Sequence, residues 1–147
     1  MNNTKKYKIL VTDYAWPTLE IEESILGNIA ELIPAPNTKA DTLKKLVPNV
    51  DVIMFNWADI PEDVMHEAKQ CIQLSRFGVG IDNIPLKLAT KLGILVTNIP
   101  DYCVDEVTDQ AMSLILSLNR QIFYFSQQSK INLNTPVFRL RNQTLGL

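Results

Sequence analysis

The chain has 147 residues, of which 46% are hydrophobic and 20% charged, and its formal net charge is -2. This length supports one globular domain with a core of its own. The 14 Lys and Arg residues form no cluster, so we expect no nucleic-acid partner. No apolar run approaches the roughly 20 residues of a bilayer span, and the polar first residues do not resemble a secretion signal. We therefore expect a cytoplasmic protein without a membrane contact.

The two cysteines indicate neither a disulfide nor a metal centre. Cys71 and Cys103 lack Cys-x-x-Cys spacing and have no pair of histidines near them. Both are expected to be reduced thiols. We expect no metal ligands in the chain.

Short apolar runs alternate with segments of helical spacing along most of the chain. The runs predict buried parallel strands at Lys8–Val11, Ile29–Ile33, Val52–Phe55, Ile72–Ser75 and Ile94–Thr97. Helices are predicted between them at Thr18–Leu26, Lys39–Leu46, Pro61–Lys69 and Pro85–Leu92. This alternation favours an α/β fold of flavodoxin-like type, a three-layer α/β/α arrangement with a five-stranded parallel sheet in the order 2-1-3-4-5. Ligands are then expected at the carboxyl ends of the strands.

The end of the chain has a different pattern. A long crossover helix is predicted over Val104–Ser126, and its apolar residues lie on more than one face, so it requires partners on several sides. Beyond it, Thr144–Leu147 is typical of the first residues of another buried strand.

The segment Arg76–Asn83 reads RFGVGIDN and lies between the predicted fourth strand and the helix that begins at Pro85. Two glycines one residue apart let the backbone approach a ligand closely, and consecutive amides beside a helix N-terminus can bind a carboxylate. A positive φ would be a second reason for glycine at position 80. The same residues also fit a tight turn capped by Asp82 or Asn83, and the segment alone does not decide between these interpretations.

Four motifs follow one another along the chain: RFGVGIDNI, GILVTNIP, VDEVTDQAMSLIL and RNQTLGL. In this order they resemble the D-isomer-specific 2-hydroxyacid dehydrogenase family over essentially the whole chain, and most of all the branch that includes the C-terminal-binding proteins. The resemblance implies a substrate (catalytic) domain at residues 1–100, then at 101–147 an interdomain crossover helix and the start of a nucleotide-binding domain that the chain lacks. The chain is thus expected to be the N-terminal, substrate-binding portion of an NAD(P)-dependent oxidoreductase, and to be inactive by itself.

The resemblance assigns the substrate carboxylate to the loop with the two glycines. It implies that the backbone amides of Phe77, Gly78, Val79 and Gly80 hold this carboxylate. Arg76 would assist by pairing with the same anion. A surface or interdomain ion pair is the alternative role for Arg76.

The resemblance also concerns the cofactor and the domain crossing. Val79 and Val107 correspond to positions near the nicotinamide cofactor, where relatives often carry Ser or Thr, so valine offers only backbone or apolar contact. Asn98 and Pro100 are implied as the interdomain hinge, which the proline would stiffen. Asn98 fits a strand-end turn equally well. NAD or NADP is implied for the full-length protein, none is expected to bind this chain, and no catalytic residue is expected within it.

Two further loops follow predicted strands at the expected ligand edge. Asp13 follows the first strand and Trp57 the third. Trp57 is a candidate for lining the pocket of the substrate's side chain, and a lid over the core is an equal alternative. The single histidine, His66, lies within a predicted helix, and we expect a structural or solvent-exposed role rather than proton transfer.

The favoured function is hydride exchange between a nicotinamide cofactor and a small 2-keto or 2-hydroxy acid, in a homodimer. The alternative is an NAD(H)-sensing interaction module like the corepressors of the similar branch. Fold alone does not decide between them. A stand-alone receiver or flavodoxin domain fits less well, because Asn56 ends the third strand, no receiver-type lysine ends the fifth, and no flavin-phosphate loop follows the first.

Overall fold

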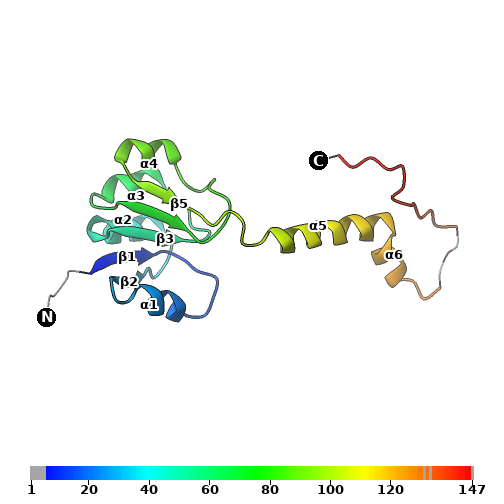
Figure 1. Ribbon diagram of the computed structural model, residues 1–147, viewed down its shortest axis with the longest axis horizontal. Coiled ribbons are helices and arrows are strands. Elements are labelled where there is room, and N and C mark those ends of the chain that lie inside the picture. The colour runs from blue at the N-terminus through cyan, green and yellow to red at the C-terminus, as the bar shows by residue number, and fades with distance from the viewer. Residues whose placement is uncertain (1–5, 131, 133, 147) are drawn as a thin grey trace. The chain divides into compact units, whose positions relative to one another are not determined.

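The computed structural model describes residues 6–130, 132 and 134–146. Its sheet has five strands: Tyr7–Val11 (β1), Ala30–Pro34 (β2), Val52–Phe55 (β3), Gln73–Arg76 (β4) and Leu95–Thr97 (β5). All neighbouring strands are parallel, and their order is β2-β1-β3-β4-β5 (Figure 1). The predicted topology is confirmed, and the ends of each predicted strand agree with the observed ones to within one residue.

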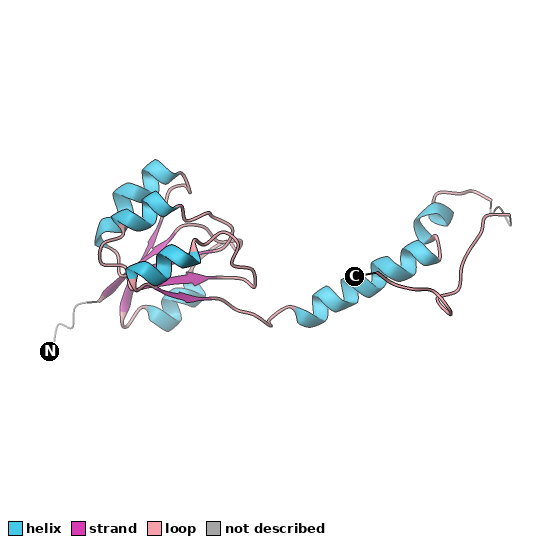
Figure 2. Ribbon diagram, turned by 90° about the horizontal axis from the view of Figure 1, so that it is seen from above, coloured by secondary structure: helices cyan, strands magenta, loops and turns pink. Residues whose placement is uncertain are grey.

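Helices cover both faces of this sheet (Figure 2). They are Glu20–Leu26 (α1), Ala40–Leu46 (α2), Glu62–Glu67 (α3) and Leu86–Leu92 (α4), with a short 3-10 helix at Val47–Asn49 (η1). One face carries the main core, in which fully buried Leu10, Ile53 and Leu74 meet residues of α2, α3 and α4. The other carries a smaller cluster in which Ile9 and Val11 meet the α1 side. Successive strand residues alternate between the faces, so a continuous apolar run fills both cores.

Gly93 ends α4 in the left-handed conformation, with φ of 70°. Its amide donates to the carbonyls of Ala89 and Thr90, which closes the last turn of the helix. The chain then enters β5 two residues later. The end of this helix predicted at Leu92 is confirmed.

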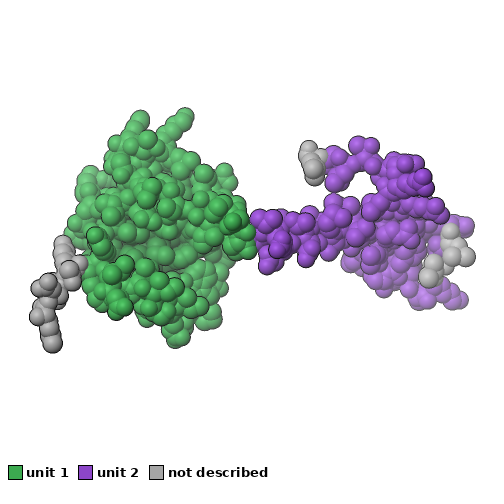
Figure 3. Space-filling view, viewed as in Figure 1, with its two compact units in different colours: residues 1–102 green, residues 103–147 purple. Residues whose placement is uncertain are grey.

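The chain forms two compact units, residues 1–102 and 103–147 (Figure 3). The second unit contains the helices Val104–Asn119 (α5) and Ile122–Ser126 (α6). The prediction of one unbroken helix over Val104–Ser126 is wrong, because Gln121 adopts the left-handed conformation with φ of 52°. The Gln121 side-chain amide donates to the carbonyl of Pro136 at 2.6 Å, so the residue at the break is hydrogen-bonded to the segment that follows α6.

The predicted strand at Thr144–Leu147 is absent from residues 144–146, and Leu147 lies outside the described residues. A strand requires a neighbour to pair with, and the second unit's described residues contain none. Neither α5 nor α6 contains a buried residue. Leu118 is 79% exposed and Phe123 is 73% exposed, so the apolar faces of these helices lack a core within the described residues.

Candidate functional site

Three loops meet at the carboxyl edge of the sheet. The strands β1, β3 and β4 are adjacent and parallel, so the segments that follow them lie side by side. These segments are residues 12–19, residues 56–61 and residues 77–83, and we call the last the glycine loop. Hydrogen bonds from side chains of the first and third of these loops to the backbone of the second join them.

The glycine loop presents free amides. The amides of Gly78, Val79 and Gly80 donate to no acceptor in the part of the chain that the structure describes. The carbonyl of Gly78 accepts from the Ile99 amide at 3.0 Å, and the carbonyl of Val79 accepts from the Asn98 side chain at 2.7 Å. The carbonyls are thus occupied while three consecutive donors remain available, an arrangement suited to an anion.

The amide of Phe77 differs from its neighbours, because it donates to the carbonyl of Phe55 at 2.8 Å. It continues the ladder between β3 and β4 by one residue. An amide with this partner has no proton left for a ligand, so the available donors begin at Gly78.

Arg76 is turned back onto the backbone. Its Nε donates to the carbonyl of Asn56 at 3.0 Å, and its Nη1 donates to the carbonyl of Gly80. It forms no ion pair with any described residue. The guanidinium therefore fastens the glycine loop to the loop after β3, a role that the sequence did not indicate.

The packing of Arg76 explains Gly80. Positive φ among the described glycines occurs only at Gly93, so the suggestion of a positive φ at Gly80 is wrong. A Cβ atom at position 80 would instead lie 2.8 Å from Nη1 of Arg76. The guanidinium of Arg76 occupies the space of a side chain at position 80, so any residue larger than glycine would displace it.

Asp13 lies at the end of β1, and its carboxylate is saturated with donors. Oδ1 accepts from the Asn56 amide at 3.0 Å and the Thr12 hydroxyl at 3.0 Å. Oδ2 accepts from the Trp57 amide at 2.7 Å and the Ala58 amide at 3.2 Å. This carboxylate fixes the course of the loop after β3.

Aromatic side chains surround the same edge. Trp57 is 68% exposed, so it does not act as a lid over the core within this chain. Trp16 packs edge-on against Phe77 with ring centroids 5.0 Å apart, and Tyr14 lies 6.0 Å from Trp16. The exposed indole of Trp57 is available to a ligand or to another part of the protein.

The remaining predicted residues occupy varied places. Val79 is exposed on the glycine loop, and Asn98 is joined to it by the hydrogen bond described above. Pro100 is exposed after β5, and Val107 is exposed on α5 in the second unit. His66 is exposed on α3, and its imidazole has no hydrogen bond to a described residue.

Comparison with known proteins decides the family. The sequence profile of the D-isomer specific 2-hydroxyacid dehydrogenase catalytic domain matches residues 5–138. The chain belongs to this family.

Relatives include both dehydrogenases and a binding protein. D-3-phosphoglycerate dehydrogenase of Methanocaldococcus jannaschii is 34% identical over 116 residues, which cover 78% of this chain and 22% of that protein. C-terminal-binding protein 1 of Caenorhabditis elegans is 30% identical over 129 residues, 86% of this chain and 18% of that protein. The chain therefore spans about a fifth of the length of these relatives.

The fold of this 2-hydroxyacid dehydrogenase domain also matches solved structures. One is the NADPH-dependent glyoxylate/hydroxypyruvate reductase of Sinorhizobium meliloti in complex with NADP and malonate, with a TM-score of 0.70 and 26% identity. The match covers 84% of this chain and 37% of the reductase chain. The family fold and the family profile thus agree.

The sequence did not reveal three residues of the site. Asp13 was visible as an acid after a buried strand, but its three amide partners are more than forty residues away in the chain. Asn83 donates from its side chain to the carbonyl of Ala58 at 2.9 Å, and Trp16 contacts Phe77. No local pattern predicts such long-range contacts.

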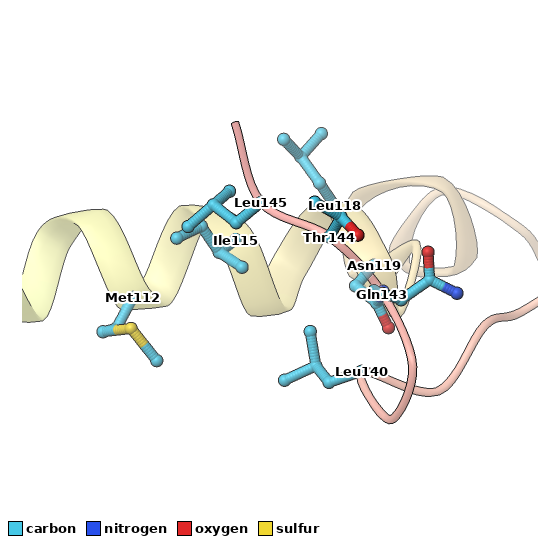
Figure 4. A pocket seen from close by; sticks show the side chains of 8 residues that line it. All are labelled: Met112, Ile115, Leu118, Asn119, Leu140, Gln143, Thr144 and Leu145. Atoms are coloured by element: carbon cyan, nitrogen blue, oxygen red, sulfur yellow. The ribbon is translucent and has the colours of Figure 1, made fainter. Parts of the chain in front are cut away.

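A cavity of about 540 Å³ lies within the second unit, between α5 and residues 140–145 (Figure 4). Met112, Ile115 and Leu118 line it from the helix, and Leu140 and Leu145 from the returning segment. It contains no titratable side chain and none of the predicted substrate residues. The glycine loop remains the candidate site because its donors suit an anionic ligand.

The described residues do not fit the pyrophosphate of a nicotinamide cofactor. In the glycine loop the spacing is Gly78-x-Gly80-x-x-Asn83, so the third glycine of a dinucleotide fingerprint is absent. The described residues also contain no group of three His, Cys, Asp or Glu side chains that could hold a metal ion. Within the same residues no helix is long and apolar enough to cross a membrane. Both cysteines are free, and burial raises the pKa of the Cys71 thiol.

Proposed function

We propose that this chain is the substrate-binding part of an NAD(P)-dependent D-2-hydroxyacid dehydrogenase, and that the amides of Gly78, Val79 and Gly80 hold the substrate carboxylate. The observation that carries this proposal is the run of three amides without an intrachain acceptor in the described residues. A hydrogen bond to a charged group contributes about 1.5–3 kcal/mol, so three such bonds would fix the orientation of a small acid.

The chain's residues would bind and orient, while the cofactor would supply or accept the hydride. With its carboxylate on the glycine loop, a 2-keto acid would have its carbonyl carbon held at a fixed distance from the loop. Trp57 is the proposed wall for the substrate's side chain because it is exposed at the same edge. Arg76 supports the loop through Gly80 and keeps its Nη2 group for the anion.

We infer the organisation of the whole protein from its family. Residues 1–100 are the proposed substrate domain, with Asn98 and Pro100 as the hinge to a nucleotide-binding domain. Val79 and Val107 are proposed to contact the nicotinamide side of NAD or NADP through apolar surface. A cytoplasmic location fits a small 2-keto or 2-hydroxy acid as substrate.

We also propose that the protein is a homodimer in which a second copy covers α5 and α6. The support is the exposure of Val107, Leu118 and Phe123 on helices that have no buried residue. An apolar surface of this kind is typical of an association site.

Turnover by the full-length protein tests the proposed function. The assay follows loss of NADH or NADPH absorbance with glyoxylate, pyruvate and hydroxypyruvate in turn. The proposal predicts saturable turnover with at least one of these acids. Binding of cofactor without turnover of any of them would instead support the alternative, a cofactor-sensing module like the corepressor branch.

A further inference from the structure

One peptide group at the candidate site is held by opposite charges at its two ends. The peptide that joins Asn56 to Trp57 donates its N–H to Oδ2 of Asp13 at 2.7 Å. Its carbonyl accepts from Nε of Arg76 at 3.0 Å. Asp13 and Arg76 form no ion pair with each other, so this peptide is their link. We call Asp13, the Asn56–Trp57 peptide and Arg76 the peptide clamp.

The sheet order creates this clamp. Asp13 follows β1 and Arg76 ends β4, and these strands flank β3, which leads directly into Asn56. Asn56 is only 7% exposed, so its backbone groups have little access to water. A buried peptide needs partners for both its polar groups, and the neighbouring strand ends provide them.

Charge makes the two bonds mutually supportive. A peptide has its positive end at the N–H and its negative end at the carbonyl. The carboxylate of Asp13 faces the N–H, and the guanidinium of Arg76 faces the carbonyl. Each hydrogen bond therefore polarises the peptide and strengthens the other hydrogen bond. The peptide is planar and rigid, so a displacement at one end is transmitted to the other.

The clamp continues to the glycine loop. Nη1 of Arg76 donates to the carbonyl of Gly80, so the guanidinium that receives its position from the Asn56 carbonyl also fixes the loop. Among the described residues, Asp13 forms no hydrogen bond or ion pair with Arg76 or Gly80. The carboxylate oxygens of Asp13 are occupied by three amides and a hydroxyl.

We propose that Asp13 is a positioning residue for the carboxylate site, acting through the Asn56–Trp57 peptide and Arg76 on the amides of the glycine loop. This inference rests on the proposed function for the identity of the ligand. The mechanical coupling between Asp13 and Gly80 does not depend on it. The two can therefore be tested separately in one experiment.

The experiment compares amide spectra of the ¹⁵N-labelled chain and its variants by NMR. Asp13→Asn keeps the size of the side chain and removes the charge. We expect the Nε–H signal of Arg76 and the amide signal of Gly80 to shift, together with that of Trp57. Asp59→Asn is the matched control, because Asp59 is an exposed acid on the loop after β3 with no hydrogen bond to a described residue. A shift at Trp57 with Arg76 and Gly80 unchanged would overturn the coupling.

A second variant covers the case in which Asp13→Asn does not fold. Arg76→Lys keeps the positive charge and removes Nε, so it breaks the bond to the Asn56 carbonyl. The clamp predicts that the Trp57 amide signal then moves, although Arg76 does not touch that amide. If the Trp57 amide signal does not move in Arg76→Lys, a change at Arg76 does not reach the Asp13 end of the peptide. That result would overturn the coupling.

A titration with pyruvate, followed by the same NMR signals, tests whether the coupling affects ligand binding. In Asp13→Asn we expect the affinity for pyruvate to fall by about tenfold, and in Asp59→Asn to stay unchanged. Equal affinity in Asp13→Asn and the unmodified chain would overturn the positioning role. If pyruvate moves no glycine-loop signal even in the unmodified chain, the proposed function fails, while the comparison of variants still tests the coupling.

Discussion

Gly80 lies against the guanidinium of Arg76, and this contact determines what the position tolerates. A Cβ atom there would approach Nη1 to 2.8 Å, which is closer than any normal contact. The end of an arginine side chain can move aside, so the backbone fold need not change. A substitution at Gly80 therefore displaces Arg76 and disturbs the loop amides while the core stays intact.

We predict that Gly80→Val in the full-length protein lowers kcat/KM for its 2-keto acid by at least about 100-fold. A misplacement of substrate by about 1 Å is sufficient for a loss of this size. Steady-state kinetics measures the loss, and melting temperatures measured beside it check the fold. His66→Ala is the control, because the exposed imidazole touches no part of the site. Full activity in Gly80→Val, or an inactive but folded His66→Ala, would contradict the assignment of this loop.

Gly93 is constrained for a different reason. Nothing lies within 4 Å of a Cβ added there, but φ is 70°. We predict that Gly93→Ala lowers the free energy of unfolding by about 1 kcal/mol, because a Cβ disfavours the left-handed conformation. Urea unfolding measures the loss. Gly93→Asn should lose less, since Asn tolerates this conformation better, and equal losses would show that φ is not the cause.

The helix end predicted at Leu92 is confirmed, because its determinant is local. Gly93 follows an apolar helical segment, and a helix end with no continuing pattern favours glycine. The role of Arg76 could not be predicted, because its acceptor on Asn56 is twenty residues away and belongs to a backbone carbonyl. The same holds for Asp13, whose three amide donors belong to another loop. The assignment of the glycine loop to a substrate carboxylate remains a prediction.

At the scale of elements, α5 and α6 differ from three of the four α-helices of the first unit, although α1 also contains no buried residue. Helices α2, α3 and α4 each bury residues against the sheet, whereas α5 and α6 bury none. Isolated short helices are marginal in water, so α6 with its five residues requires packing partners.

We predict that the chain self-associates and that Leu118→Glu weakens the association. Leu118 is 79% exposed on α5, and a carboxylate there would have to be desolvated in an apolar interface. Sedimentation velocity measures the change from dimer toward monomer. Gln110→Glu is the control, because it adds the same charge at an exposed polar position of the same helix. A strictly monomeric unmodified chain at high concentration, with α5 ordered, would contradict this account of the helix.

The break between α5 and α6 shows why the length of the last helix was overestimated. The apolar spacing continues past Gln121, so a single residue in the left-handed conformation leaves no trace in the pattern. The partners of the break are the carbonyls of Pro136 and Phe138, which accept from Gln121 and Arg120. The end of α5 thus coincides with contacts to residues that follow α6 in the chain, and the apolar spacing carries no information about these contacts.

For the whole molecule, the sheet topology followed from the sequence because buried parallel strands must be apolar runs and their connections are short and right-handed. The family profile over residues 5–138 agrees with that topology. The activity is a property of the whole protein, and this chain corresponds to 22% of the phosphoglycerate dehydrogenase relative. The chain itself can test the proposed recognition of the substrate's carboxylate.

The most direct test of that recognition is an NMR titration of the ¹⁵N-labelled chain with pyruvate and, in a parallel sample, with pyruvamide. Pyruvamide keeps the keto group and replaces the charged carboxylate with a neutral amide. The account predicts that pyruvate shifts the amide signals of Gly78, Val79 and Gly80 in a saturable way and that pyruvamide leaves them in place. Equal shifts with both compounds, or shifts confined to residues outside the glycine loop, would contradict it.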